Sequence, residues 1–114
     1  MEAILARLLD LFCCEGGAAA GYMRAGFTEI VGVDSVHQRR YPYEFIQADV
    51  LELTPSFLAS FDAIHASPPC QFGSELTPED ARSRHLNPIP ATRALLRRSG
   101  RPYVIETCAT CASI

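Results

Sequence analysis

The chain has 114 residues, of which 48% are hydrophobic, so it is long enough for one small domain and lacks the composition of a disordered protein. No apolar run approaches the roughly 20 residues that span a membrane, and the N-terminal segment is too short and too charged for a signal peptide. We therefore expect a cytoplasmic protein whose five cysteines are reduced thiols. The net charge of −3 argues against a general nucleic-acid binder.

Predicted strands and helices alternate along the chain. The expected strands are residues 7–12, 27–33, 43–48, 61–66 and 102–106. The expected helices are residues 18–25, 50–60 and 91–98, with a further helical turn at residues 35–40. Pro55 interrupts the second of these helices and suits a first helical turn if that helix begins near Thr54. The start of the chain is ambiguous, because residues 3–9 also suit a helical turn. The alternation predicts an α/β domain with an open, mostly parallel sheet and helices on both faces.

Acidic residues fall at the ends of the predicted strands. Asp34, Asp49 and Glu106 lie at or just beyond three of these ends, and Asp10 lies inside the first strand. The glycine-containing turn at residues 13–17 lets a backbone approach a ligand. It is not the Gly-x-Gly-x-x-Gly fingerprint of dinucleotide-binding proteins, and its acidic residue would repel a pyrophosphate.

These acids favour a cofactor without phosphate, and S-adenosylmethionine carries a ribose, an adenine, an amino acid end and a sulfonium. Asp34 lies where an acid bonds the ribose hydroxyls in nucleoside-binding α/β folds, and Asp49 could bond the adenine amino group. Each aspartate could instead be a turn or cap residue.

A single thiol, Cys70, follows the fourth predicted strand. Pro68 and Pro69 end that strand, because proline cannot continue a central strand, and they stiffen the backbone before the thiol. Loops at this edge of an α/β sheet hold ligands, so Cys70 is a candidate for chemistry, with a buried structural cysteine as the alternative. All ten basic residues are arginines, and six lie in residues 81–101, which contain no acid. That segment is either a phosphate-binding face or a solvated helix surface.

Three segments together resemble motifs of the DNA cytosine-5 methyltransferases. Residues 10–17, Asp-Leu-Phe-Cys-Cys-Glu-Gly-Gly, resemble the first motif of that family, and residues 67–71, Ser-Pro-Pro-Cys-Gln, look like its catalytic Pro-Cys-Gln motif. Residues 104–106, Val-Ile-Glu, look like the start of its Glu-Asn-Val motif. The order and spacing match over residues 7–106. The resemblance implies a Rossmann-like S-adenosylmethionine-dependent methyltransferase fold that is incomplete at the C-terminus.

The resemblance also implies a mechanism. Cys70 would add as a thiolate to carbon 6 of a flipped cytosine in DNA, and a protonated Glu106 would bond N3, so that carbon 5 takes the methyl group. The residues that would bind the cofactor are Asp10, Phe12, Cys13, Gly16, Gly17, Asp34, Ser35, Asp49, Val50 and Pro69. The residues that would contact DNA are Gln71, Ser74, Arg82 and Arg84. No metal site is expected.

The sequence departs from the family pattern in two places. Cys14 and Glu15 replace the usual Gly-Ala, and residues 107–108, Thr-Cys, replace the Asn-Val that should follow Glu106. Because the motif breaks at one point, we expect a catalytic domain at residues 1–106 and an irregular, frameshifted tail at residues 107–114. Coding DNA in which no single-base insertion after codon 106 restores Asn-Val would contradict the frameshift.

Two other function classes stay open. One is a non-catalytic S-adenosylmethionine-binding fragment, or one subunit of a split methyltransferase whose partner chain supplies target recognition. The other is a thiol redox protein, suggested by Cys108 and Cys111 in a C-x-x-C; a zinc site would need more ligands. His65, inside the fourth strand, is expected to be packed rather than catalytic.

Overall fold

The computed structural model describes residues 6–68 and 88–106. The expectations that lie outside these residues concern Pro69, Cys70, Gln71, Ser74, Arg82, Arg84 and the tail at residues 107–114.

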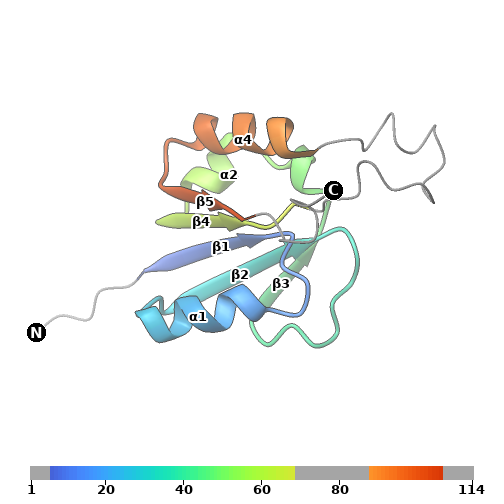
Figure 1. Cartoon of the computed structure of the whole chain (residues 1–114), viewed down its shortest axis with the longest axis vertical. Helices are drawn as coiled ribbons and strands as arrows, with labels where there is room; N and C mark the ends of the chain where they lie inside the picture. Colours follow the sequence, from blue (N-terminus) through green and yellow to red (C-terminus); the bar gives the residue numbers. More distant parts are fainter. Residues whose placement is uncertain (1–5, 69–87, 107–114) are drawn as a thin grey trace, which may run out of the picture.

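The described chain forms one sheet of five parallel strands in the order β3-β2-β1-β4-β5 (Figure 1). The strands are β1 Arg7–Leu11, β2 Glu29–Asp34, β3 Glu44–Gln47, β4 Ala63–Ala66 and β5 Tyr103–Ile105. The predicted α/β class is therefore confirmed, and each strand lies within two residues of its expected bounds. Central β1 is buried on both faces, so Leu8, Leu9 and Leu11 are all 0% exposed.

Helices cover both faces of the sheet (Figure 1). Helix α1, Gly17–Ala25, lies on one face, and α2, Pro55–Ala59, and α4, Pro88–Ser99, lie on the other. Alternate strand residues face each layer, which gives two cores. The core under α2 and α4 contains Leu9, Leu11, Val31, Val33, Val50, Leu58, Phe61, Ile64, Ala66, Leu95 and Leu96. The core under α1 contains Leu8, Cys13, Ala19, Ile30 and Tyr41. Within the described ranges, no helix is long and apolar enough to cross a membrane.

The helix predicted over residues 50–60 is confirmed only from Thr54 onward, where Pro55 takes the expected place in the first helical turn, and a continuous helix from residue 50 is wrong. The chain forms a 3-10 turn, η1 Val50–Glu52, and then the separate helix α2. Thr54 divides them because it is extended and caps α2: its Oγ1 accepts a hydrogen bond from the Phe57 N–H at 3.1 Å. Pro55 stands in the first helical turn, where its missing N–H is not needed.

The helical turn predicted at residues 35–40 is also wrong. The Asp34 Oδ1 accepts a hydrogen bond from the Val36 N–H at 3.1 Å, and this side-chain turn competes with a helix. The segment instead runs through bends and turns to Tyr41, whose side chain packs into the core under α1. Tyr41 thereby comes to lie beneath the turn that joins β1 to α1.

Candidate functional site

The carboxyl ends of β1 and β4 form the point where the strand order reverses. The chain leaves β1 for β2 and β3 on one side and returns to β4 on the other, and ligands of open α/β sheets bind outside such a point. Backbone hydrogen bonds continue past the strand ends there: Ser67 N–H donates to the Leu11 carbonyl at 3.1 Å and Glu106 N–H to the Ala66 carbonyl at 2.8 Å. These bonds bring the segments after β1, β4 and β5 together at one edge.

The turn between β1 and α1 has an unusual backbone. Phe12 and Cys14 have φ angles of 57° and 47°, in the left-handed region that non-glycine residues rarely occupy. Gly16 has a φ of 98°, and a Cβ on it would lie 3.1 Å from the Pro42 ring. Such strained residues cost about 1–3 kcal/mol each and concentrate at functional sites. The turn is therefore held in a conformation that local sequence preferences do not favour.

The N-terminus of α1 opens from this turn. Gly16 caps the helix without a side chain, and the first turn contains no acidic residue. A Cβ placed on Gly17 would meet nothing within 4 Å, so the space beside this residue is open. The free N–H groups and the positive end of the helix dipole can bind an anionic group, such as the carboxylate of an amino acid ligand.

Asp34 connects this turn to the end of β2. Its Oδ2 accepts a hydrogen bond from the Cys14 N–H at 3.1 Å, while its Oδ1 holds the turn that follows β2. A carboxylate has about four acceptor positions, so Asp34 keeps the capacity to bind ligand hydroxyls. The neighbouring Ser35 is exposed. The glycine-containing turn and this acid, both predicted from the sequence as cofactor-binding elements, are thus in direct contact.

The residues predicted around the adenine divide between surface and core. Asp49 is exposed and caps η1, with its Oδ1 accepting a hydrogen bond from the Leu51 N–H at 3.0 Å. Val50 is 2% exposed and belongs to the core under α2 and α4, against which Phe12 also packs. Val50 is therefore part of this core, and Phe12 packs against the same core with only part of its side chain accessible.

Asp10 lies inside the domain, with 1% of its surface exposed. Its Oδ2 accepts a hydrogen bond from the Tyr41 hydroxyl at 3.0 Å. Burial raises the pKa of Asp10 from 3.8 to about 7; the Tyr41 bond opposes this rise and the charge of Asp34 adds to it. Tyr41 lies over Gly32 of β2, where a side chain would collide with its ring. Sequence reasoning missed Tyr41, although a glycine inside a predicted strand is a signal of close packing.

The Asp10→Asn substitution is expected to remove a pH dependence of stability. The folded state holds a proton on Asp10 up to about pH 7, whereas an unfolded aspartate loses it near 3.8. Stability should therefore fall as the pH rises between these values, by roughly 2–4 kcal/mol. Asparagine keeps an acceptor for Tyr41 and cannot ionise. Urea unfolding at pH 5 and pH 8 should show a smaller loss for the variant, and parallel curves would contradict the assignment.

The two cysteines of the turn are not activated thiols. Burial raises the pKa of Cys13 to about 12, with Asp10 and Asp34 adding to the effect. Burial also raises the pKa of Cys14, which is the more exposed of the two, and the nearby carboxylates act in the same direction. Both thiols are protonated at neutral pH, so neither is suited to be a nucleophile. Cys13 instead packs in the core under α1.

His65 connects two elements at this edge. It is 3% exposed, as expected for a packed residue, with its Nδ1 2.8 Å from the Tyr22 hydroxyl and its Nε2 3.0 Å from the Ser67 hydroxyl. Glu106 is exposed just beyond β5 and is close enough for its charge to affect the pKa of His65. The sequence did not predict the contacts of Tyr22 and Ser67 with this histidine.

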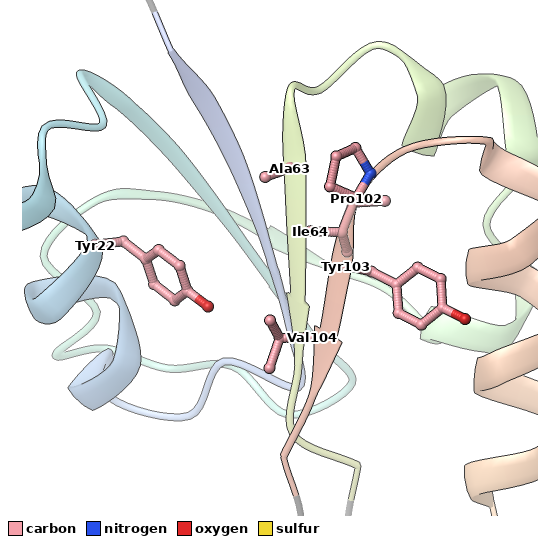
Figure 2. A pocket seen from close by; sticks show the side chains of 6 residues that line it. All are labelled: Tyr22, Ala63, Ile64, Pro102, Tyr103 and Val104. Atoms are coloured by element: carbon pink, nitrogen blue, oxygen red, sulfur yellow. The ribbon is translucent and has the colours of Figure 1, made fainter.

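The described part of the chain also has a shallow pocket that lies apart from this edge. Figure 2 shows it beside β4 and β5, lined by Tyr22, Ala63, Ile64, Pro102, Tyr103 and Val104. Its lining contains none of the predicted site residues. Among residues 6–68 and 88–106, no group of three His, Cys, Asp or Glu side chains could hold a metal ion.

Comparison with known proteins finds one curated relative and several solved structures of the same fold. No protein-family model matches the chain. It is 33% identical over 75 residues to the Type II methyltransferase M.FnuDI of Fusobacterium nucleatum, and the match covers 60% of this chain. The match covers only 22% of that enzyme, so the chain spans about a fifth of the length of this curated relative.

Solved structures show the same architecture. An Escherichia coli prophage protein assigned as a DNA modification methyltransferase superposes with a TM-score of 0.60 and 21% identity, over 90% of this chain and 32% of that protein. An S-adenosylmethionine-dependent methyltransferase from Mesorhizobium loti gives 0.60 and 16%, over 94% and 48%. A Streptococcus pneumoniae protein assigned as an NADH-flavin reductase gives 0.59 and 20%, over 88% and 46%. The chain therefore has the Rossmann-like fold of S-adenosylmethionine-dependent methyltransferases, and the Streptococcus pneumoniae protein has the same fold.

Proposed function

We propose that this chain is the cofactor-binding and catalytic part of an S-adenosylmethionine-dependent DNA cytosine-5 methyltransferase. The observation that carries the proposal is the first turn, where Asp34 holds the Cys14 N–H beside the open N-terminus of α1. This combination offers an anion-binding helix end and a hydroxyl-binding carboxylate without a phosphate cradle. It fits the amino acid end and the ribose of S-adenosylmethionine, and the match to a Type II methyltransferase supports the same class.

The remaining cofactor roles follow from this placement. Phe12 would stack against the adenine with its accessible part, and exposed Asp49 would bond the adenine amino group. Gly16 and Gly17 would pass close to the methionine end. Val50 would support the adenine site from the core rather than contact it with an exposed side chain.

Cytosine is the proposed acceptor because Cys70 and Glu106 follow adjacent strands. Cys70 is two residues beyond Pro68 in the sequence, after β4. Glu106 follows β5 and is bonded through its N–H to the last residue of β4. A nucleophile and an acid on neighbouring segments of one edge are what addition to a pyrimidine ring requires.

The proposed chemistry balances without an oxidant or a metal. The Cys70 thiolate adds to carbon 6 of cytosine, Glu106 shares a proton with N3, and carbon 5 becomes nucleophilic. S-adenosylmethionine, when bound, would supply an electrophilic methyl group: its bond to the sulfonium sulfur would break as carbon 5 takes the methyl, and S-adenosylhomocysteine would leave. After methylation, a base takes the carbon 5 proton and the Cys70 sulfur leaves, which restores the aromatic ring.

DNA is the proposed partner, with the cytosine flipped out of the duplex at a cost of a few kcal/mol. Gln71, Ser74, Arg82 and Arg84 would contact it, the arginines through bidentate bonds to phosphate. The chain spans only part of its curated relative, so a second candidate is a fragment or subunit that binds the cofactor but needs a partner chain for transfer.

Calorimetric titration with S-adenosylmethionine and transfer of a tritiated methyl group to duplex DNA test the proposal. Asp34→Asn should weaken cofactor binding roughly tenfold or more, because it removes the negative charge and leaves one acceptor oxygen where the carboxylate has two, one for Cys14 and one for Val36. Asp62→Asn is the matched control: its Oδ2 accepts a hydrogen bond from the Arg7 N–H at 2.7 Å, at the opposite edge of the sheet.

The combined results separate the candidates. Binding with transfer by this chain supports the enzyme, and transfer only after addition of a second polypeptide supports the split form. Binding without transfer under either condition supports the cofactor-binding fragment. Equal affinities for wild type and Asp34→Asn would contradict the proposed cofactor site.

A further inference from the structure

Two ionisable side chains, those of Asp10 and His65, lie side by side on the face of the sheet covered by α1. Asp10 of β1 is in register with Gly32 of β2 and with His65 of β4, and His65 is in register with Val104 of β5. Register partners in a parallel sheet point to the same face. The two ionisable side chains each meet one tyrosine, Tyr41 for Asp10 and Tyr22 for His65. The first pair lies under the proposed cofactor turn, and the second lies under the start of the segment that leads to Cys70.

The second pair extends to the edge of the sheet. The His65 ring is hydrogen-bonded at both nitrogens, to the hydroxyls of Tyr22 and Ser67. Tyr22 also contacts the ring edge to face, with the ring centroids 5.3 Å apart. Figure 2 shows the Tyr22 side chain extending from α1 toward the face of the sheet that carries Val104. Burial lowers the pKa of His65, so the ring is neutral at pH 7, with one donating and one accepting nitrogen. The three side chains form one continuous hydrogen-bond chain in either tautomer.

This chain of hydrogen bonds ends at Ser67, the first residue after β4. Ser67 is held twice, by its hydroxyl on His65 and by its N–H on the Leu11 carbonyl at 3.1 Å. Buried Pro68 follows at once, and Cys70 is three residues beyond Ser67. The other end of this hydrogen-bond chain is Tyr22 in α1, the helix that follows the proposed cofactor turn. A displacement of about 1 Å at a reacting group can cost a hundredfold in rate, so the direction in which this segment leaves the sheet matters for catalysis.

We propose that Tyr22, His65 and Ser67 are positioning residues that fix the start of the Cys70 segment relative to the helix of the cofactor turn. This inference rests on the proposed function, because it assigns these three hydrogen-bonded side chains a role in the reaction at Cys70. Tyr22 anchors the imidazole, the imidazole orients the Ser67 hydroxyl, and Ser67 sets the path of the backbone toward the nucleophile. None of the three touches the reacting atoms.

The test uses single-atom changes that preserve packing, because replacement of the buried His65 could unfold the domain. Tyr22→Phe and Ser67→Ala each break one bond of the chain, Ser67→Thr keeps the hydroxyl, and Tyr103→Phe makes the same change as Tyr22→Phe on the opposite face of the sheet. Hydrogen exchange of the Ser67 amide reports how firmly the segment is held. The kcat for methyl transfer and the Kd for S-adenosylmethionine report the effect on the reaction.

Tyr22→Phe and Ser67→Ala should each speed exchange of the Ser67 amide and lower kcat roughly fivefold, with the Kd for the cofactor changed less than twofold. The double variant should have the same kcat as either single variant, because the three side chains act as one hydrogen-bonded unit. Ser67→Thr should restore kcat, and Tyr103→Phe should match wild type.

Unchanged exchange, or faster exchange with an unchanged kcat, would overturn the inference and leave the proposed function intact. A wild-type protein that binds the cofactor and transfers no methyl group, alone or with a partner chain, would overturn both.

Discussion

Replacement of Cys70 by serine is expected to abolish methyl transfer, with a loss on the order of 10³–10⁶-fold in kcat. Carbon 5 of cytosine attacks a methyl group only after a nucleophile has added to carbon 6, and a serine hydroxyl is a far weaker nucleophile than a thiolate. Neither described cysteine can replace it, since Cys13 and Cys14 both have raised pKa values and Cys13 is buried. Tritiated methyl transfer to duplex DNA, compared with cofactor binding by the same variant, measures the effect.

Cys111→Ser provides the matched control for this substitution. It makes the same sulfur-to-oxygen change outside the proposed catalytic motif, so transfer should continue at the wild-type rate. The control also tests the thiol redox alternative, because it destroys the C-x-x-C pair. Undiminished transfer by Cys70→Ser would contradict covalent catalysis and favour direct methylation of an exocyclic amino group.

Replacement of Gly32 by alanine is expected to destabilise the domain by roughly 3–5 kcal/mol. A Cβ at this position would overlap the Tyr41 ring, far inside van der Waals contact. Tyr41 is buried and donates its hydroxyl to Asp10, so the ring can move only by giving up that bond and leaving the buried carboxyl unsatisfied. Urea denaturation should therefore show a much lower midpoint for the variant.

Gly21→Ala is the control for this prediction. Gly21 lies inside α1, and a Cβ there would meet nothing within 4 Å. Alanine should be neutral or stabilise the helix by about 0.5–1 kcal/mol, because it restricts the unfolded chain. Equal midpoints for the two variants would show that Tyr41 is not packed tightly against β2.

The sheet could be predicted because its signals are local. Short apolar runs marked every strand to within two residues, and their alternation with helices predicted a parallel sheet. The helix predictions failed where polar side chains form hydrogen bonds with nearby backbone N–H groups. Asp49 caps a 3-10 turn where residues 50–52 were expected to be α-helical, and Asp34 replaced a helical turn with a side-chain turn.

The candidate site was predictable in outline for a geometric reason. Parallel strands present their carboxyl ends at one edge, so acids at strand ends gather there, and Asp34 does meet the first turn. Its interior could not be predicted, because burial depends on contacts between distant segments. Asp10 is hydrogen-bonded to Tyr41, which is 31 positions away in the sequence, and His65 is hydrogen-bonded to Tyr22, which is 43 positions away. The positive φ angles of Phe12 and Cys14 carry no sequence signal at all.

Nucleoside analysis of the methylated product tests the proposed chemistry most directly. Duplex DNA is incubated with the protein and S-adenosylmethionine carrying a tritiated methyl group, with the partner chain added if transfer requires it, and is then digested to nucleosides. We expect the label in 5-methylcytosine from wild-type protein and none from Cys70→Ser. Label in N4-methylcytosine or N6-methyladenine would contradict a thiol addition at carbon 6.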